Sequence, residues 1–224
     1  MNSKLSNIIA VDGLAATGKG TIARRLAAHL GYAYLDTGLL YRAVGLSVIV
    51  SGGDPFDPAA AIPAAQKLDP AALDALMDDP RLRSDVGGQA ASKVGAIQGV
   101  RDALFQFQRN FALNPPDSKA GAVLDGRDIG TVIAPDAMVK IYVEATPEIR
   151  ARRRFLELQS RGENVTESAV LEDLQTRDAR DVSRSVVPAK PAEDAIHLDT
   201  TNLTIDEAVA AAIRIVEDRQ KARS

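Results

Sequence analysis

A glycine-rich loop close to the N-terminal end carries the strongest chemical signal in the sequence. It reads Gly13-Leu14-Ala15-Ala16-Thr17-Gly18-Lys19-Gly20-Thr21. Glycines let the backbone wrap closely around an anion, and Lys19 supplies a mobile cation for the β- and γ-phosphates of a nucleotide. The simpler alternative is a tight strand-to-helix turn with an incidental lysine. The apolar run before the loop and the amphipathic pattern after it favour the first interpretation, so we predict a nucleoside triphosphate site.

The residue after the lysine departs from the usual form of such loops. A serine or threonine commonly follows the lysine and contacts Mg²⁺. Here Gly20 follows, and the hydroxyl comes one residue later, at Thr21. The spacing does not support direct binding of Mg²⁺ by Thr21, and the metal ligands stay unassigned.

Two further polar segments come directly after predicted strands. Asp36-Thr37-Gly38, with Tyr41-Arg42 behind it, follows the second strand, and Asp125-Gly126-Arg127-Asp128 follows the third. In an open parallel sheet, ligands bind beyond the carboxyl ends of the strands. We therefore expect both segments to meet the glycine-rich loop in one crevice. A charged turn without further role is the alternative for the second of them.

The segment between residues 150 and 184 uses arginine, and no lysine, as its basic residue. It contains Arg150, Arg152, Arg153, Arg154, Arg161, Arg177, Arg180 and Arg184. The planar guanidinium suits bidentate recognition of phosphate, and Arg177 and Arg184 share one face of a predicted helix. For Arg150, Arg152 and Arg161 a solvated helix surface is the favoured interpretation. We expect the others to form a mobile lid that neutralises the transferring phosphoryl group and excludes water.

The elements that must position these residues follow from hydrophobic periodicity. Apolar runs predict five strands, at residues 7–12, 32–36, 122–125, 138–144 and 195–199. Helical patterns lie between them, including a long one over residues 89–113, and Thr37 can cap the helix after the second strand. Strands alternating with helices predict an α/β fold: a five-stranded parallel sheet flanked by helices, of the P-loop NTPase type.

The chain is expected to form a single P-loop kinase domain over residues 1–224. Within it, residues 37–115 form an insertion that would bind the phosphoryl acceptor, and residues 150–187 form the arginine-rich helical lid. Residues 58–85 are rich in alanine and proline, so we predict helix and loop there rather than strands.

Composition narrows the class of protein. The 224 residues carry a net charge of −3, which argues against a general nucleic-acid footprint. There is no cysteine, which removes thiolate catalysis and cysteine-bound zinc. No apolar run is long enough to cross a bilayer. We expect a cytoplasmic monomer with no nucleic-acid and no membrane partner.

Several functions remain open on the residues alone. A guanine-reading Asn-Lys-x-Asp motif is missing from the sequence, and the insertion and the arginines favour a small kinase. Its acceptor could be a nucleotide or a small metabolite such as shikimate. A regulatory nucleotide-binding module that does not turn over is the alternative from another class.

In combination, the motifs resemble those of the bacterial cytidylate kinases, a family of nucleoside monophosphate kinases. The similar segments are Gly18-Lys19-Gly20-Thr21, Leu35-Asp36-Thr37-Gly38 with Tyr41-Arg42, Asp125-Gly126-Arg127-Asp128-Ile129-Gly130-Thr131, the stretch from Arg177 to Arg184, and Leu198-Asp199-Thr200-Thr201. They occur in order along nearly the whole chain.

The resemblance implies ATP- and Mg²⁺-dependent phosphorylation of CMP and dCMP. By position it assigns catalysis to Lys19, Arg127, Arg180 and Arg184. It assigns ATP binding to the loop residues 13–21 with Arg153 and Arg154. It assigns CMP binding to Thr37, Tyr41, Arg42, Ser92, Arg101, Arg127, Asp128, Arg177, Asp181 and Arg184.

The implied division of labour in the CMP site is chemical. Ser92 and Asp128 would accept from the 4-amino group of cytosine, and Arg101 would donate to N3 or O2. The acceptor phosphate would be held by Arg42, Arg127 and Arg184, and the sugar would lie near Tyr41, Arg177 and Asp181.

The sequence departs from the family pattern in two places. Thr37 replaces a serine common in the family but keeps the hydroxyl. Residues 58–85 are shorter than the corresponding segment of many bacterial relatives, which includes small antiparallel strands. The preference between CMP and dCMP is therefore not assigned.

Overall fold

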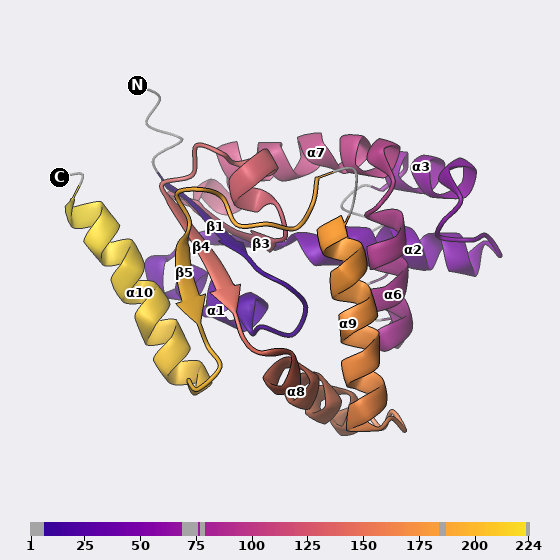
Figure 1. Cartoon of the computed structure of the whole chain (residues 1–224). Coiled ribbons are helices and arrows are strands. Elements are labelled where there is room, and N and C mark those ends of the chain that lie inside the picture. Colours follow the sequence, from indigo (N-terminus) through magenta and orange to yellow (C-terminus); the bar gives the residue numbers. More distant parts are fainter. Residues whose placement is uncertain (1–6, 69–75, 77–78, 184–186, 223–224) are drawn as a thin grey trace.

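The computed structural model describes residues 7–68, 76, 79–183 and 187–222. Five strands form one parallel sheet in the order β2-β3-β1-β4-β5 (Figure 1). The strands are β1 (Ile8–Asp12), β2 (Ala33–Asp36), β3 (Ala122–Gly126), β4 (Val139–Glu144) and β5 (Ile196–Asp199). The predicted parallel α/β sheet is confirmed.

The register of the sheet brings three strand ends together. Asp12 of β1 is the partner of Gly126 in β3, and Asp36 of β2 is the partner of Asp125 in β3. The glycine-rich loop and the two polar segments therefore leave the sheet side by side, at its carboxyl edge.

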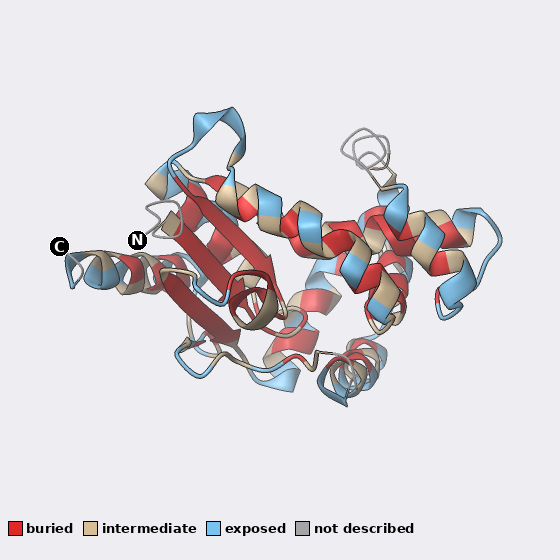
Figure 2. Cartoon of the chain, turned by 90° about the horizontal axis from the view of Figure 1, so that it is seen from above, coloured by how far each residue is buried: buried red, intermediate tan, exposed pale blue. Residues whose placement is uncertain are grey.

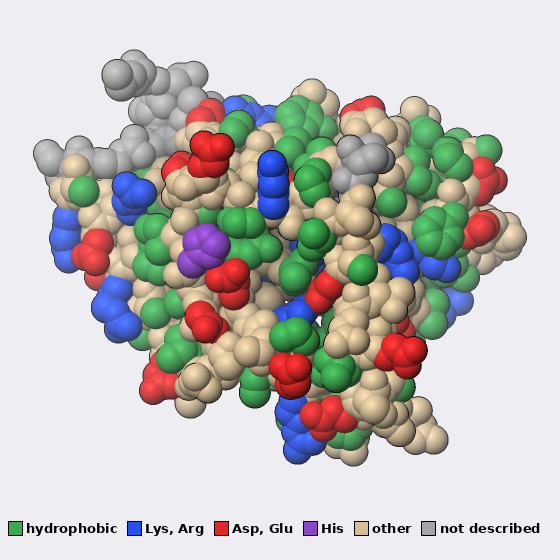
Figure 3. Space-filling model, in the orientation of Figure 1, with side chains coloured by type: hydrophobic (Ala, Val, Ile, Leu, Met, Phe, Trp, Pro, Cys, Tyr) green, Lys and Arg blue, Asp and Glu red, His purple; other side chains and the backbone are tan. Residues whose placement is uncertain are grey.

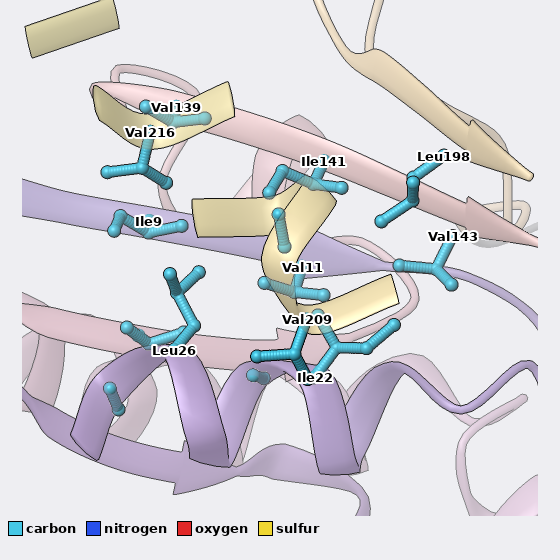
Figure 4. Packing of buried hydrophobic residues seen from close by; sticks show 14 of the residues in the cluster. Ile9, Val11, Ile22, Leu26, Val139, Ile141, Val143, Leu198, Val209 and Val216 are labelled. Carbon is cyan, nitrogen blue, oxygen red and sulfur yellow. The ribbon is translucent and has the colours of Figure 1, made fainter. Parts of the chain in front are cut away.

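Helices cover both faces of the sheet. On one face, α1 (Lys19–Leu30) and α10 (Ile205–Lys221) pack against Ile9 and Val11 of β1 (Figure 4). On the other, α7 (Gln98–Leu113) and a π-helical turn, η3 (Ile129–Ile133), pack around Ile8 and Ala10. The central strands are buried on both sides (Figure 2). This double burial explains why β1 is a continuous apolar run rather than an alternating one.

A group of helices extends the molecule beyond the edge of the sheet (Figure 1). It consists of α2 (Thr37–Val50), α3 (Pro58–Gln66), α5 (Pro80–Arg83), α6 (Asp85–Val94) and α7, which a short turn, η2 (Pro116–Ser118), follows before β3. Within the described part of residues 58–85 there are helices and no strand, as predicted. α2 and α6 cross closely at Gly45, where a Cβ would lie 2.6 Å from the Cβ of Ala90.

The prediction of one helix over residues 89–113 is wrong. The chain forms two helices, α6 and α7, separated at Gly95–Ile97, and Ile97 is extended with φ −94° and ψ 117°. Val94 and Val100, on either side of the break, are fully buried in the same cluster. Because the apolar positions continue across the break, the periodicity gave no sign of it.

Asp36, and not Thr37, caps α2. The carboxylate of Asp36 accepts a hydrogen bond from the backbone N–H of Leu39, the usual arrangement at a helix N-terminus. The hydroxyl of Thr37 donates instead to the carbonyl of Asp125 across 2.7 Å. Thr37 therefore ties β3 to the start of α2.

The arginine-rich segment forms two helices that lie over the glycine-rich loop. α8 (Pro147–Ser160) and α9 (Glu167–Ser183) pack on each other. Ala15 of the loop is buried between them, together with Ala151, Leu158 and Leu174. α9 also contacts α6 (Figure 1), so it spans from the loop to the helical insertion. No described helix combines the length and the apolar character that a membrane crossing requires.

Candidate active site

The glycine-rich loop has the backbone of an anion cradle. Gly13 approaches β4 so closely that a Cβ would lie 2.3 Å from the carbonyl oxygen of Val143. Ala16 and Gly18 have φ of 60° and 90°, in the left-handed region, where a non-glycine residue is strained and often functional. α1 begins at Lys19, so the positive end of its dipole points at the same space.

Lys19 lies among buried charges at the three strand ends. Its Nζ is 3.4 Å from the carbonyl oxygen of Leu14. Burial, and then the charge of Arg127, lower the pKa of Lys19, whereas Asp125 and Asp36 oppose that shift. An anionic phosphate placed here would favour the charged form of the lysine.

Asp125 is one of the carboxylates whose charge acts on Lys19. It is 4% exposed, and the hydroxyl of Tyr34 donates to its Oδ2 across 2.6 Å. Burial, and then the charge of Asp36, raise the pKa of Asp125. A Cβ on Gly20 would lie 3.3 Å from the same Oδ2, so the glycine after Lys19 leaves room for the carboxylate.

One cavity joins the cradle to the acceptor segments. Its lining includes every described residue that the sequence assigned to CMP: Thr37, Tyr41, Arg42, Ser92, Arg101, Arg127, Asp128, Arg177 and Asp181. Ala15, Ala16, Lys19, Gly20 and Arg154 line the same cavity. In the space-filling view, basic and acidic side chains show at the hollow between the sheet and α9 (Figure 3). The predicted convergence of strand ends on one crevice is therefore present.

Sequence reasoning missed other parts of this lining. Asp36, Arg83 and Glu157 face the cavity as well. The sequence motifs include Asp36 only as the first residue of the segment Asp36-Thr37-Gly38. Its place at the end of a strand, next to Asp125 in the register, was the available signal.

The base-reading candidates are paired with one another. Arg101 and Asp128 form an ion pair, and their side chains are only 7% and 8% exposed. Ser92 donates from its hydroxyl to Oδ1 of Asp181 across 2.9 Å. The Nε of Arg127 donates to the other oxygen of Asp181 across 3.2 Å. Donors and acceptors thus converge in a buried space, held by α6, α7, α9 and the turn after β3.

Two arginines crowd together at the other side of the cavity. Burial, and then the charge of Arg177, lower the pKa of Arg42 to about 9. Burial, and then Arg127, lower the pKa of Arg177 to about 10. A Cβ on Gly88 would lie 2.9 Å from Arg177 and 3.3 Å from Arg42. Nε of Arg177 is buried without a hydrogen-bond partner among the described residues. This cluster suits an anion, because an anion would stabilise the charged guanidinium groups.

A second cavity lies on the other side of the loop. Ala16, Thr17, Gly18, Thr21, Arg153 and Arg154 line it, together with Thr200, Leu203, Thr204 and Ile205. Arg153 donates to the carbonyls of Thr17 and Thr200, across 3.2 and 2.6 Å. The segment 200–205 was not assigned a role from the sequence, although it follows β5 directly and so begins at the carboxyl edge of the sheet.

Some assigned residues lie elsewhere. Gly13 and Leu14 shape the loop but line neither cavity. Arg180 lies outside both cavities, with its guanidinium 5.8 Å from the ring centre of Phe56 and 3.5 Å from Oε1 of Gln89. Arg184 falls outside the described residues.

The surface interpretation of Arg150 is wrong. Arg150 is 3% exposed, donates to the carbonyl of Ala15 across 3.2 Å and pairs with Asp178 at 2.6 Å. It therefore links α8, α9 and the glycine-rich loop. Arg152 is on the surface as predicted and pairs with Glu167. Arg161 pairs with Glu157 and also reaches the rim of the first cavity.

Comparisons with known proteins identify the family to which the chain is similar. A family model described as cytidylate kinase matches residues 9–218. The cytidylate kinase of Rhodospirillum rubrum is 55% identical over 214 residues, which are 96% of this chain and 99% of that protein. The cytidylate kinase of Paramagnetospirillum magneticum is 54% identical over 216 residues, 96% of this chain and 100% of that protein.

A solved structure supports the fold alone. An uncharacterized protein from Eubacterium ventriosum superposes with a TM-score of 0.51 at 15% identity. The superposition covers 94% of this chain and 98% of that chain.

Proposed function

The chain belongs to the cytidylate kinase family, and from that premise we propose that it transfers the γ-phosphoryl group of ATP to CMP or dCMP. The observation that carries this proposal is the single cavity that Lys19 and Asp128 both line. A transfer between two nucleotides requires a phosphate site and a base site at one space, and the shared lining supports assigning the first to the loop and the second to the groups around Asp128.

The donor would lie along the glycine-rich loop. Its phosphates would bind the backbone N–H groups of residues 13–21 and Nζ of Lys19. The second cavity continues from Thr17 and Thr21 toward Leu203 and Ile205. This mixture of hydroxyls and apolar side chains suits the sugar and the flat base of ATP. Arg153 and Arg154 border that cavity on the lid side.

The acceptor base would lie against Asp128, Ser92 and Arg101. Cytosine presents an amino donor where uracil presents a carbonyl, and a carboxylate can only accept. Asp128 therefore favours cytosine, since uracil would leave a buried acceptor unmatched. To bind, the base must replace part of the present pairing of Arg101 with Asp128 and of Ser92 with Asp181.

The acceptor phosphate would bind the crowded cations. Arg42 and Arg127 face the cavity, and Arg177 lines it with a buried Nε that has no hydrogen-bond partner in the described part of the chain. Arg184 keeps its proposed role at this phosphate. Arg180 keeps a role in phosphoryl transfer only if α9 moves, because its guanidinium now contacts Gln89 and Phe56.

Two carboxylates suit the Mg²⁺ that accompanies ATP. Among the described residues there is no cluster of three or more metal-binding side chains. Mg²⁺ usually keeps several waters and binds one or two carboxylates plus substrate phosphates. Asp36 and Asp125, adjacent at two strand ends and beside Lys19, meet that description and would hold it. When bound, Mg²⁺ supplies positive charge to the reacting phosphates.

The chain's own groups would act by positioning and by charge. The attacking phosphate oxygen of CMP is already anionic near neutral pH, so no general base is needed. Lys19 and the arginines would neutralise charge on the transferred group during in-line displacement. α8 and α9 would exclude water and so suppress hydrolysis of ATP.

We further propose that the protein works as a monomer in the cytoplasm, without nucleic-acid or membrane partners. The net charge of −3 supports the absence of a nucleic-acid footprint.

Product analysis tests the proposed reaction. Incubation with ATP, Mg²⁺ and CMP should give CDP and ADP in equal amounts, and dCMP should give dCDP. A regulatory module that only binds nucleotide would form neither product. ADP without CDP would mean hydrolysis, and would contradict the proposal.

A further inference from the structure

Asp12 has contacts that the proposed reaction does not explain. It is the last residue of β1 and directly precedes the glycine-rich loop. Its side chain binds backbone groups outside that loop: Oδ1 accepts from the backbone N–H of Ile129 across 2.9 Å, and Oδ2 accepts from that of Gly130 across 2.8 Å. The residue is 5% exposed. Both carboxylate oxygens are therefore used on one backbone turn more than a hundred residues away.

The two N–H groups are the first of the π-helical turn η3. The first N–H groups of a helix have no partner within it. An aspartate directly before the helix normally accepts from the N–H of the second or third helical residue. Here the residue in that position is Asp128, and its side chain makes no such hydrogen bond. Asp12, from another strand, satisfies those groups instead.

Because Asp12 caps η3 in place of Asp128, the carboxylate of Asp128 can take another position. Were Asp128 to cap its own turn, its carboxylate would fold back onto the N–H of Gly130, the second residue of the turn. Because Asp12 already accepts from the Gly130 N–H, the carboxylate of Asp128 extends into the cavity and pairs with Arg101. We propose that Asp12 is a positioning residue for acceptor selectivity, since by capping η3 it leaves the carboxylate of Asp128 free to read the base.

The surroundings of Asp12 fit this role. Gly130 lies against both Asp12 and β4: a Cβ there would be 3.4 Å from Oδ2 of Asp12 and 3.1 Å from Cδ of Lys140. Lys140 itself directs its Nζ to Asp194 at 2.8 Å. The turn is thus held closely at its start, and the only carboxylate in contact with its first N–H groups within the described structure is that of Asp12.

The inference rests on the proposed function, because it concerns how Asp128 selects cytosine. Asp12→Asn tests it with little change of shape. An amide offers one acceptor oxygen and one donor group, so one of the two N–H groups loses its partner, and Asp128 becomes the available cap. We expect the ratio of kcat/KM for CMP to that for UMP to fall at least about fivefold. The KM for ATP should stay within about twofold of the wild-type value.

Arg109→Gln is the matched control. Arg109 donates to the carbonyl of Ile133, at the far end of the same turn, across 2.9 Å. Replacing Arg109 by glutamine is expected to loosen η3 at that end, without freeing the N–H groups that Asp128 could cap. A role for Asp12 in stability alone predicts that both variants leave the CMP to UMP ratio unchanged, or that both lower it equally. Either result would overturn the inference.

A double-mutant cycle separates this inference from the proposed function. If Asp128→Asn alone leaves the ratio unchanged, Asp128 does not read the base and the proposed function is wrong at that point. If Asp128→Asn lowers the ratio but Asp12→Asn does not, only the inference fails. If both lower it, adding Asp12→Asn to Asp128→Asn should have no further effect. Should Asp12→Asn fail to fold, Asp12→Ser, which keeps one acceptor oxygen in a smaller side chain, takes its place with the same expected results.

Discussion

Replacing Asp128 by asparagine changes the one buried carboxylate proposed to distinguish cytosine from uracil. Asp128 is 6% exposed, so a base placed against it would be out of contact with bulk water. The substitution keeps the size of the side chain and removes its charge. The amide can accept from cytosine less strongly, and its amino group can donate to the O4 carbonyl of uracil.

The magnitude follows from the cost of a buried polar mismatch. One such contact is worth about 1–3 kcal/mol, which corresponds to roughly a 5- to 150-fold change in a ratio of rate constants. We expect the kcat/KM ratio for CMP over UMP to fall by that factor, with CMP losing and UMP gaining. The assay is ADP formation with each acceptor at saturating ATP and Mg²⁺.

Stability must be measured alongside, because Arg101 loses its charged partner. Its side chain is 7% exposed, and a buried unpaired charge is costly, so the free energy of unfolding should also fall. Asp136→Asn is the control: it removes the carboxylate of an Arg109–Asp136 pair close to the same turn but outside the cavity. An unchanged CMP to UMP ratio in a folded Asp128→Asn protein would refute the assignment.

Three further outcomes are expected. Gly45→Ala should lower the free energy of unfolding by about 1–3 kcal/mol in urea titrations, because the new Cβ would meet the Cβ of Ala90 at 2.6 Å; unchanged stability would mean that α2 and α6 are further apart. Arg177→Ala should reduce kcat/KM for CMP by about 10- to 100-fold. Arg180 lies outside both cavities, so Arg180→Ala should change kcat/KM less than about threefold. A larger loss in Arg180→Ala than in Arg177→Ala would contradict the described position of α9. Burial, opposed by the hydrogen bonds from Gly130 and Ile129, raises the pKa of Asp12 from 3.8 to about 6, with Asp128 adding to the shift and Lys19 reducing it. The folded protein thus binds a proton near pH 6 that the unfolded chain binds only near pH 4. The free energy of unfolding of the wild type, minus that of Asp12→Asn, should therefore be greater at pH 5 than at pH 7, by about 1 kcal/mol. An increase of this difference with pH would contradict the buried environment of Asp12.

The sheet and most of the site could be predicted from the sequence. Strands such as β1 and β3 are buried on both faces. Their apolar residues are therefore consecutive, which distinguishes them from the spaced apolar positions of an amphipathic helix. The loop from Gly13 to Thr21 and the segment from Asp125 to Asp128 are local motifs, and their chemistry shows in consecutive residues.

What could not be predicted depends on partners distant in the chain. Arg150 can be buried because it donates a hydrogen bond to Ala15 and forms an ion pair with Asp178. Both partners are distant in the sequence, so no local pattern predicts these contacts. The role of Asp12 could not be predicted either, because the N–H groups that it binds, those of Ile129 and Gly130, come after β3. The break before α7 was hidden because the buried positions keep a helical spacing across it.

The central claim is that one cavity joins ATP to a cytosine nucleotide. It is tested most directly by kcat/KM of the wild-type protein with CMP, dCMP, UMP and shikimate as acceptors at saturating ATP and Mg²⁺. The account predicts that CMP or dCMP is the best acceptor and that UMP is well below both. A value for UMP that exceeds the value for CMP would contradict it.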